Sequence, residues 1–377
     1  MFRVSILLEN VIFILDEFAS QSFNSRPVYN TKLLAIVILL AILCCGGCQQ
    51  ITQPPSAQIA QPPSAQITQP PNAVVAQDGS GNYNTIMAAV LAAPNNSIEK
   101  YYIQIKEGTY NEYVQIEEWQ MNIVLIGEGM DKTIISGNKS YGGGIGLYDT
   151  ATMGVNGKGF MAQDITFRNT AGANNQMAAA LRATADHCTF YRCQFDGFQD
   201  TLYSHVGKQF YRECKILGTI DFICGDAAAV FQNCLIEARL PLPSQYNIIT
   251  AQQRNAENRT TGFVLQNCTL KLATPDADNV TIYLGRPWDK FSRTVVMQSY
   301  IDVLINPRGW IEFEGLPLVH PFYMEYENRG PGANTNERVK WALITSDPKI
   351  ASNFTVRHFI NGNEWIPSTV PHYLDLL

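Results

Sequence analysis

Short runs of apolar residues recur along the chain from about Tyr101 onward, and Gly, Asn and Asp stand between them. Runs of this kind, rich in β-branched and aromatic residues, are typical of β-strands. They include NIVLIG at 122–127, FMAQDITFRN at 160–169 and GFVLQNCTLKL at 262–272. Because the runs return every roughly 20 to 30 residues, the pattern predicts an all-β solenoid, a parallel β-helix in which each coil stacks on the one before.

A repeated phrase that ends in cysteine sharpens this prediction. It occurs as FYRC at 190–193, FYREC at 210–214, VFQNC at 230–234 and VLQNC at 264–268. Residues that are one coil apart in a solenoid lie on neighbouring strands, roughly 4.8 Å from each other. The repeat therefore predicts which distant residues become neighbours.

Two aspartates, Asp200 and Asp221, have the same spacing of 21 residues as Cys193 and Cys214. If they lie on adjacent coils, their carboxylates cannot both ionise easily, and their pKa values move apart. Such a pair can provide an acid and a nucleophile from one residue type. A single buried Asp would more simply be structural, but two in register favour a function.

Other side chains near this pair could complete a site. Gln199, next to Asp200, and the earlier Gln176 could supply amide donors on the same face. Arg286 could keep one carboxylate ionised. Tyr203 and Trp288 would offer ring faces on which a sugar could stack.

The N-terminal part of the chain differs in composition from the rest. Residues 1–50 form a leader with an apolar run, LLAIVILLAILCCG, at 33–46. Its length is typical of a signal peptide and short for a membrane span, but an uncleaved signal anchor stays an alternative because the run begins far from the N-terminus. Residues 51–74 repeat a proline-rich phrase that predicts an extended linker.

Residues 75–377 are predicted to form the folded domain. A helix-like stretch lies within 76–94, and further short helices are predicted near the C-terminus. We expect both sets of short helices to pack against the ends of the solenoid.

Composition and motifs exclude several classes of function. The net charge is −6 and no basic tract occurs, which argues against nucleic acid as a partner. No G-x-S-x-G motif is present, so a serine-hydrolase site has no support. The six cysteines from Cys188 to Cys268 and the five histidines lack zinc-ligand spacing, and we expect no metal site. Cys234 and Cys268 are the preferred disulfide, whereas Cys193 and Cys214 could form a bridge or stack as free thiols.

Several motifs around these residues resemble those of the pectinesterases, the plant pectin methylesterases. The resemblance extends from about Val75 to Trp365. The motifs are GTYNE at 108–112, QMAAAL at 176–181, GFQDTLY at 197–203, DFICG at 221–225 and LGRPW at 284–288. The short proline-rich segment in place of a helical pro-region is similar to the pro-region-free type of the family.

The resemblance implies a right-handed parallel β-helix that hydrolyses methyl esters of homogalacturonan to pectate and methanol. It implies that Asp221 is the nucleophile, that Arg286 keeps it ionised, and that Asp200 is the acid and then the base. Gln176 and Gln199 would donate to the oxyanion. The side chains that would line the sugar-binding cleft are Tyr203, Trp288 and Trp310.

The same resemblance implies no cofactor, a homogalacturonan substrate and a proteinaceous pectinesterase inhibitor as a further partner. We expect a monomer that is secreted to the extracellular cell wall, with anchoring through residues 33–46 as the alternative. Sequons for N-glycosylation are consistent with export.

Two positions depart from the family pattern. Cys224 stands where an aromatic residue is usual, and Asp226 replaces a usual Asn. An inward-facing Asp226 would raise the pKa of Asp221. These changes leave open a second function, a catalytically weak β-helix protein that binds pectin in the wall. A polygalacturonase or lyase is a third alternative, which the motifs around the aspartates do not favour.

Overall fold

The computed structural model describes residues 70–274, 280–303 and 305–377. The leader, its apolar run at 33–46 and the linker up to residue 69 lie outside the described residues. The first strand begins at Ala73, so the last two residues of the predicted linker belong to the folded domain. No helix within the described ranges is both long and apolar enough to cross a membrane.

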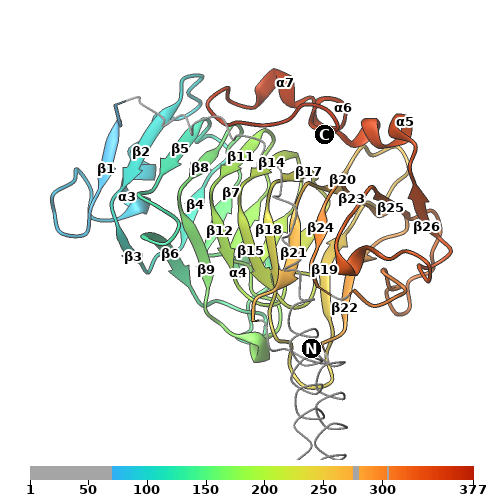
Figure 1. The fold of residues 1–377 in the computed structure, drawn as a ribbon. Coiled ribbons are helices and arrows are strands. Elements are labelled where there is room, and N and C mark those ends of the chain that lie inside the picture. The colour runs from blue at the N-terminus through green and yellow to red at the C-terminus, as the bar shows by residue number, and fades with distance from the viewer. Residues whose placement is uncertain (1–69, 275–279, 304) are drawn as a thin grey trace, which may run out of the picture. The chain divides into compact units, whose positions relative to one another are not determined.

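The described strands form three parallel sheets that stack along one axis (Figure 1). Sheet A has eleven strands: β1 (Ala73–Val75), β2 (Tyr101–Ile105), β5 (Ile123–Ile126), β8 (Met161–Gln163), β11 (Cys188–Tyr191), β14 (Lys208–Arg212), β17 (Ala228–Gln232), β20 (Gly262–Gln266), β23 (Arg293–Met297), β25 (Phe322–Tyr326) and β26 (Ala342–Thr345). Sheet B has eight: β3 (Gly108–Tyr110), β6 (Thr133–Gly137), β9 (Thr166–Asn169), β12 (Gln194–Asp196), β15 (Lys215–Gly218), β18 (Leu235–Ala238), β21 (Thr269–Leu272) and β24 (Tyr300–Ile301). Sheet C has seven: β4 (Val114–Ile116), β7 (Met153–Val155), β10 (Leu181–Ala183), β13 (Leu202–Ser204), β16 (Ile223–Gly225), β19 (Asn247–Gln252) and β22 (Ile282–Pro287).

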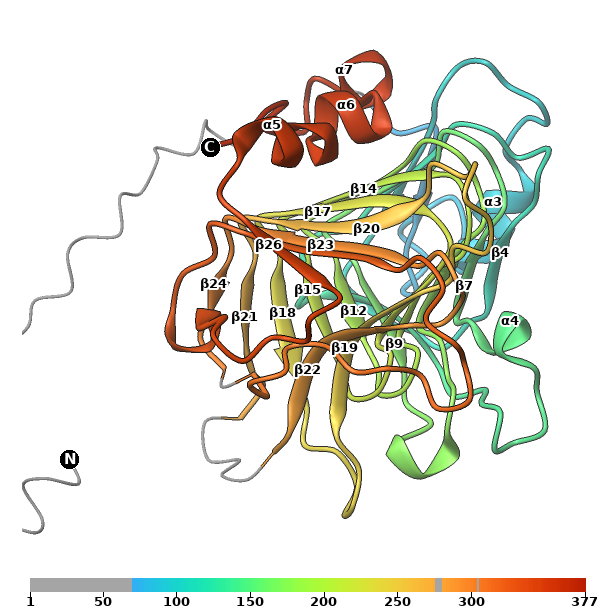
Figure 2. The same ribbon diagram turned by 90° about the vertical axis from the view of Figure 1, so that its right-hand side faces the viewer.

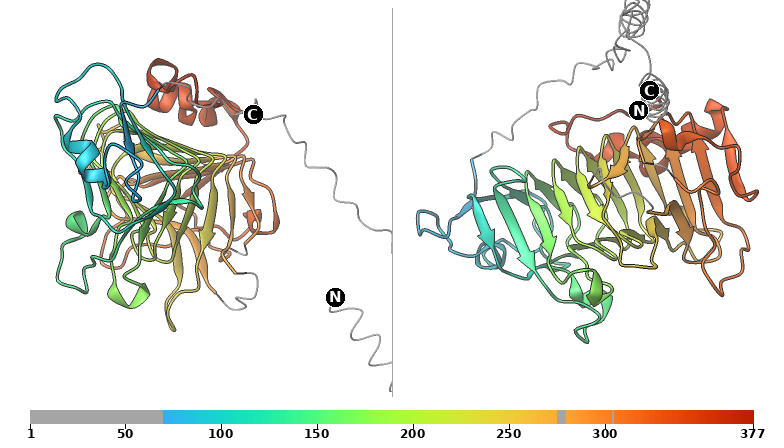
Figure 3. Two further views of the ribbon diagram at one scale, coloured as in Figure 1. Left: turned by 90° about the vertical axis from the view of Figure 1, so that its left-hand side faces the viewer. Right: turned by 60° about the horizontal axis from the view of Figure 1, so that its bottom comes forward.

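Each coil from β2 to β22 contributes one strand to each sheet, and the coils at the two ends contribute to fewer. Strands that are adjacent in a sheet are therefore one coil apart in the chain (Figure 3). In sheet C, for example, Leu202 pairs with Ile223 in parallel. Parallel strands joined by such crossovers wind with a right hand. The predicted right-handed parallel β-helix is confirmed.

The interior is filled by side chains that stack on themselves from coil to coil. Phe190, Tyr211 and Phe231 occupy equivalent positions of sheet A, with ring centroids 4.9 and 4.5 Å apart in nearly parallel planes. Repetition of the FYRC-type phrase along the sequence therefore appears in the fold as a column of rings. Burial of these large apolar surfaces is the main source of stability.

The cysteines that end each phrase form a second buried column. Cys193, Cys214, Cys234 and Cys268 are all free thiols, so the predicted disulfide between Cys234 and Cys268 is wrong for this structure. Cys268 donates from Sγ to the carbonyl of Phe231 on the preceding coil, and Ser299 takes the same role one coil later by donating to Leu265. A serine at the next step of the column indicates that the position requires a small hydrogen-bond donor rather than a bridge.

Helices occur at one end and along one side of the solenoid. Helix α3 (Ile86–Leu91) closes the N-terminal end, as predicted, and buries Ile86 and Val90 in the core. The short elements α4 (Leu147–Thr150), η1 (Ala173–Asn175) and η2 (Pro331–Ala333) lie in loops.

The C-terminal helices differ in position from the prediction. They are α5 (Pro348–Ala351), η3 (Ser352–Phe354), α6 (Val356–Ile360) and α7 (Gly362–Trp365). Instead of capping the end of the solenoid, they lie along the outer face of sheet A (Figure 2). That face carries apolar residues such as Phe210, Val230 and Val264, and the helices bury them.

Candidate active site

Asp200 and Asp221 lie in the turns that lead into β13 and β16 of sheet C. The pairing of Leu202 with Ile223 places the two aspartates in register, and the amide of Asp200 donates to the carbonyl of Ile220 at 3.1 Å. Both residues have a left-handed backbone, with φ of +58° and +51°. This conformation is uncommon outside Gly, Asn and Asp, and it is frequent at functional sites.

Arg286, on β22, holds Asp221 with two hydrogen bonds. Its Nε donates to Oδ1 at 2.9 Å and its Nη2 donates to Oδ2 at 2.5 Å. The carboxylate is 1% exposed. A bidentate arginine is the geometry that best stabilises an ionised carboxylate.

Asp200 has a different environment, although it is equally buried. Its Oδ1 has no hydrogen-bond partner. Burial, and then the charge of Asp221, raise the pKa of Asp200 well above its usual value, while Arg286 lowers it by a smaller amount. Asp200 is therefore the member of the pair that keeps its proton to higher pH.

Burial raises the pKa of Asp221 as well, but the hydrogen bonds and charge of Arg286 oppose that shift. The indole of Trp288 also acts to lower the pKa of Asp221. The two carboxylates are coupled, and the arginine decides which of them loses its proton first. The arrangement provides one acid and one anion side by side.

Gln176 and Gln199 lie at the same edge of sheet C, one coil apart. Gln199 pairs with Met177 in a parallel bridge, and its carbonyl accepts from the amide of Ala178 at 3.1 Å. Gln176 has a left-handed backbone with φ of +59° and an exposed side chain. The backbones of the two residues thus lie at the edge that carries Asp200, from which their side-chain amides could reach an oxyanion.

Tyr203 belongs to a row of side chains that crosses sheet C next to the carboxylates. The register aligns Arg182, Tyr203, Cys224, Ala251 and Arg286 on five consecutive strands. Tyr203 is half-buried, whereas Cys224 is 7% exposed. Burial raises the pKa of the Cys224 thiol well above its usual value, so this residue is a neutral side chain rather than a nucleophile.

The sequence did not identify Arg182, although it precedes Tyr203 by the same 21 residues that separate the aspartates. Its guanidinium carbon lies 3.6 Å from the ring centroid of Tyr148, and Nη1 donates to Asn156 at 2.8 Å. Tyr148 is exposed. Arg182 thus adds a further position to the row beside Tyr203, and its guanidinium holds the ring of Tyr148 there.

Trp288 is half-buried at the opposite end of the row and packs edge-on against Phe313, with ring centroids 5.5 Å apart. Phe313 also covers Arg286, whose guanidinium carbon lies 4.5 Å from its ring centroid. Phe313 therefore shields the ion pair of Arg286 and Asp221 from water. The predicted place of Trp288 beside the carboxylates agrees with this geometry.

Trp310 does not line the site, and this prediction is wrong. Its side chain is fully buried and its Nε1 donates to Glu325 at 3.2 Å. Trp310 pairs with Gly285, and a Cβ at that glycine would come within 3.2 Å of the indole. The absent side chain of Gly285 leaves the space in which the indole packs, inside the core.

Asp226 does not oppose the nucleophile. Its Oδ2 pairs with Nη2 of Arg259 at 2.7 Å, and its Oδ1 accepts from Thr261 and Gln252. The charge of Asp226 is thus compensated locally, and it is not among the groups that shift the pKa of Asp221. Among the described residues, no group of three or more His, Cys, Asp or Glu side chains could hold a metal ion.

Comparison with known proteins agrees with this geometry. A family model described as Pectinesterase matches residues 72–363. The chain is 50% identical over 305 residues to the pectinesterase/pectinesterase inhibitor PPE8B of Prunus persica. The aligned region covers 79% of this chain and 58% of that protein. The chain is also 50% identical over 300 residues to pectinesterase 2 of Citrus sinensis, covering 78% and 58%. The chain thus spans less than two thirds of the length of these curated relatives.

Solved structures show the same similarity. The pectin methylesterase from carrot matches with a TM-score of 0.80 and 44% identity over 82% of this chain and 100% of that chain. The pectin methylesterase from Aspergillus niger matches with a TM-score of 0.69 and 30% identity over 80% and 99%. By the family model and by these relatives, the chain belongs to the pectinesterase family.

Proposed function

We propose that this chain hydrolyses the methyl esters of homogalacturonan, the methyl-esterified galacturonan of pectin, to free carboxylate and methanol. The observation that carries the proposal is the unequal pair of buried aspartates. Asp221 is held by two hydrogen bonds from Arg286, while Asp200 has an unpartnered Oδ1 and a strongly raised pKa. Family membership supports the choice of substrate.

In the first half of the reaction, Asp221 attacks the ester carbonyl carbon. A bond forms from its carboxylate oxygen, and the carbonyl electron pair moves to the oxygen. The amides of Gln176 and Gln199 donate to that oxyanion. When it collapses, the bond to the methoxy group breaks, and Asp200 transfers its proton to the departing methanol.

In the second half, Asp200 is ionised and accepts a proton from water. The hydroxide formed attacks the acyl carbon of the anhydride that joins substrate and Asp221. The acid product leaves, and Asp221 returns to its ionised form beside Arg286. Tyr203 and Trp288 would stack against the sugar rings and hold the ester in reach.

The alternative, a weak pectin-binding protein, has less support. It depended on Asp226 and Cys224 as changes that damage the site. Asp226 is paired with Arg259 at 2.7 Å, and Cys224 lies next to Tyr203 in the row, so one aromatic ring remains beside the carboxylates. The five residues assigned to catalysis are all present.

We further propose that the protein acts outside the cell, in the wall, where its substrate lies. The leader with its apolar run at 33–46 supports export. A signal anchor at the same residues is the alternative, and a proteinaceous inhibitor remains a predicted partner.

The function is tested by incubating the full chain with highly methylated pectin and measuring methanol and new reducing ends in the same samples. The proposal predicts that methanol accumulates while reducing ends stay at the level of the protein-free control. New chain ends would instead indicate a glycosidase or lyase. Pectin binding without either product would select the binding protein.

A further inference from the structure

A second row of residues crosses the outer face of sheet A, which is a different sheet from the one that carries the aspartates. The register aligns Lys208 with Ala228 and Ala228 with Gly262, and it continues through Arg293 to Phe322. The two smallest residues therefore lie between the two cations. Gly262 has its Cα against the stem of Arg293, where an added Cβ would come within 2.9 Å of the arginine Cδ.

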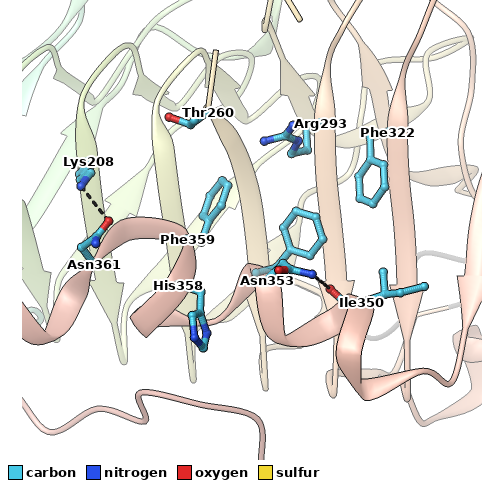
Figure 4. Close-up of a pocket in the computed structure, with 10 residues that line it drawn as sticks. Lys208, Thr260, Arg293, Phe322, Ile350, Asn353, His358, Phe359 and Asn361 are labelled. Carbon is cyan, nitrogen blue, oxygen red and sulfur yellow. Dashed lines mark hydrogen bonds between the residues drawn. The ribbon is translucent and has the colours of Figure 1, made fainter. Parts of the chain in front are cut away.

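Three residues of this row, Lys208, Arg293 and Phe322, line one side of an open pocket of about 490 Å³ under the C-terminal helices. Phe354 and Phe359 form the opposite wall, and Phe354 stacks on Phe322 with ring centroids 5.2 Å apart. Figure 4 shows Phe359 between Lys208 and Arg293. The volume is within the range of ligand sites in proteins.

Arg293 has no anionic partner in the described structure. Its Nε has no hydrogen-bond partner, and Nη1 makes one long bond of 3.4 Å to the carbonyl of Thr261. None of the described residues that line the pocket carries a carboxylate. Burial, and then the charge of Arg254, lower the pKa of Arg293 to about 10, as expected for a cation that lacks compensation.

Asp226, two residues before Ala228 of this row, is paired with Arg259. The Nζ of Lys208 donates to the amide oxygen of Asn361 at 3.1 Å (Figure 4). The carboxylate of Asp186 accepts from the backbone amide of Lys208 at 2.8 Å, and Asp186 is not one of the residues that line the pocket. Lys208 and Arg293 lie at the ends of an aromatic-walled pocket, and none of the described residues that line it is acidic. Such a pocket fits an anionic ligand with an apolar face.

We propose that this pocket binds de-esterified galacturonate residues, as a second carbohydrate site distinct from the catalytic pair. Lys208 and Arg293 lie three strand spacings apart, roughly 14 Å between their Cα atoms. That separation suits two carboxylates on a short uronate chain better than one small anion. The apolar faces of the sugar rings would pack on Phe354 and Phe359, and Asn353 and Asn361 would bond hydroxyl groups.

The inference rests on the proposed function, because each ester that is hydrolysed adds one carboxylate to the polymer. The methyl ester is neutral and offers nothing to either cation. The pocket would therefore discriminate product from substrate and keep the protein on stretches of polymer that it has already converted.

The test uses the full-length Asp221→Asn protein, so that an added ester is not converted. Trigalacturonate or its methyl ester is added, and hydrogen exchange is followed in residues 348–362, which cover the pocket. We expect trigalacturonate, and not its ester, to slow exchange there. Lys208→Met with Arg293→Met should weaken this binding by about tenfold or more. Lys340→Met, which removes one exposed charge elsewhere, should leave it unchanged.

Equal protection by the acid and the ester, or no protection by either, would overturn the proposal. So would protection by inorganic phosphate alone, which would make the pocket a general anion site. The comparison of trigalacturonate with its methyl ester needs no pocket variant. It therefore still tests whether the pocket binds the acid if the double variant does not fold. Methanol release by the wild-type chain is measured separately, so failure of the second site and failure of the esterase function give different results.

Discussion

Two arginines on two faces of the same solenoid have opposite surroundings. Arg286 on sheet C makes two hydrogen bonds to the carboxylate of Asp221 and is covered by Phe313. Arg293 on sheet A faces a pocket without any acidic side chain, and its Nε has no partner. Both lie in rows that contain small residues, Cys224 and Ala251 in one case and Ala228 and Gly262 in the other.

The difference shows how a β-helix assigns chemistry to its faces. Stacking fixes which residues are neighbours, and small residues within a row leave room beside larger ones. The turns that lead into the row decide the role of its arginine. Where a turn carries an aspartate, the arginine lowers the pKa of that carboxylate; where it does not, the arginine can bind an anionic ligand. On sheet C those turns carry Asp200 and Asp221, whereas none of the described residues that line the pocket on sheet A is acidic.

The largest effect should come from removing the carboxylate of Asp221, which Arg286 binds. Asp221→Asn keeps the shape of the side chain but is a poor nucleophile, and we expect methanol release to fall by roughly 10⁴-fold or more. The rate is measured on methylated pectin with protein of unchanged thermal midpoint. The matched control is Asp131→Asn, at an exposed position, which should retain full activity. Comparable rates for the two variants would remove Asp221 from the mechanism.

A smaller effect is expected from the amides at the edge of sheet C. Gln199→Ala should lower kcat by about 10²–10³-fold because one donor to the oxyanion is lost. KM should change much less, since the donor acts mainly in the transition state. Steady-state kinetics on a short methylated oligogalacturonate separates the two constants. A raised KM with unchanged kcat would assign Gln199 to substrate binding instead.

The smallest effect is predicted at Asp226, between the two faces. Its carboxylate already has Arg259, Thr261 and Gln252 as partners, and it does not shift the pKa of Asp221. Asp226→Asn should therefore change kcat/KM by less than about threefold, and it should lower the free energy of unfolding by about 1–3 kcal/mol because Arg259 loses its anionic partner. Denaturant unfolding and methanol release measure the two quantities. A large gain in activity would revive the view that Asp226 impairs the nucleophile.

Much of the catalytic face could be predicted because the chain has no insertion between β10, β13 and β16. Each step there is 21 residues, so equal spacing in sequence became register in the sheet. Arg182 could have been found by the same rule. The next two steps are 27 and 35 residues long, and spacing alone could not place Arg286 beside Asp221.

The incorrect predictions concern the orientation of a side chain, the bonding of cysteines and the position of helices, none of which follows from the spacing of residues along the chain. Trp310 belongs to an isolated bridge rather than a strand. The sequence around it therefore lacks the alternation of apolar and polar residues that would indicate an inward-pointing side chain. The cysteines were correctly expected in one column, but register cannot distinguish stacked thiols from a bridge. The C-terminal helices were placed at the end of the solenoid because the apolar outer face of sheet A was not recognised as a surface that needs cover.

The most direct test of the central claim is the pH dependence of kcat/KM for the wild-type chain and for Arg286→Met. Burial raises the pKa of Asp221, and Arg286 opposes that shift, so its loss should raise the pKa further. Asp221 must be ionised to attack, and the acidic limb of the profile should therefore move to higher pH in the variant. The alkaline limb reports the proton of Asp200, with apparent values that belong to the coupled pair. A profile that falls in height while its acidic limb stays in place would contradict the claim that Arg286 acts by keeping Asp221 ionised.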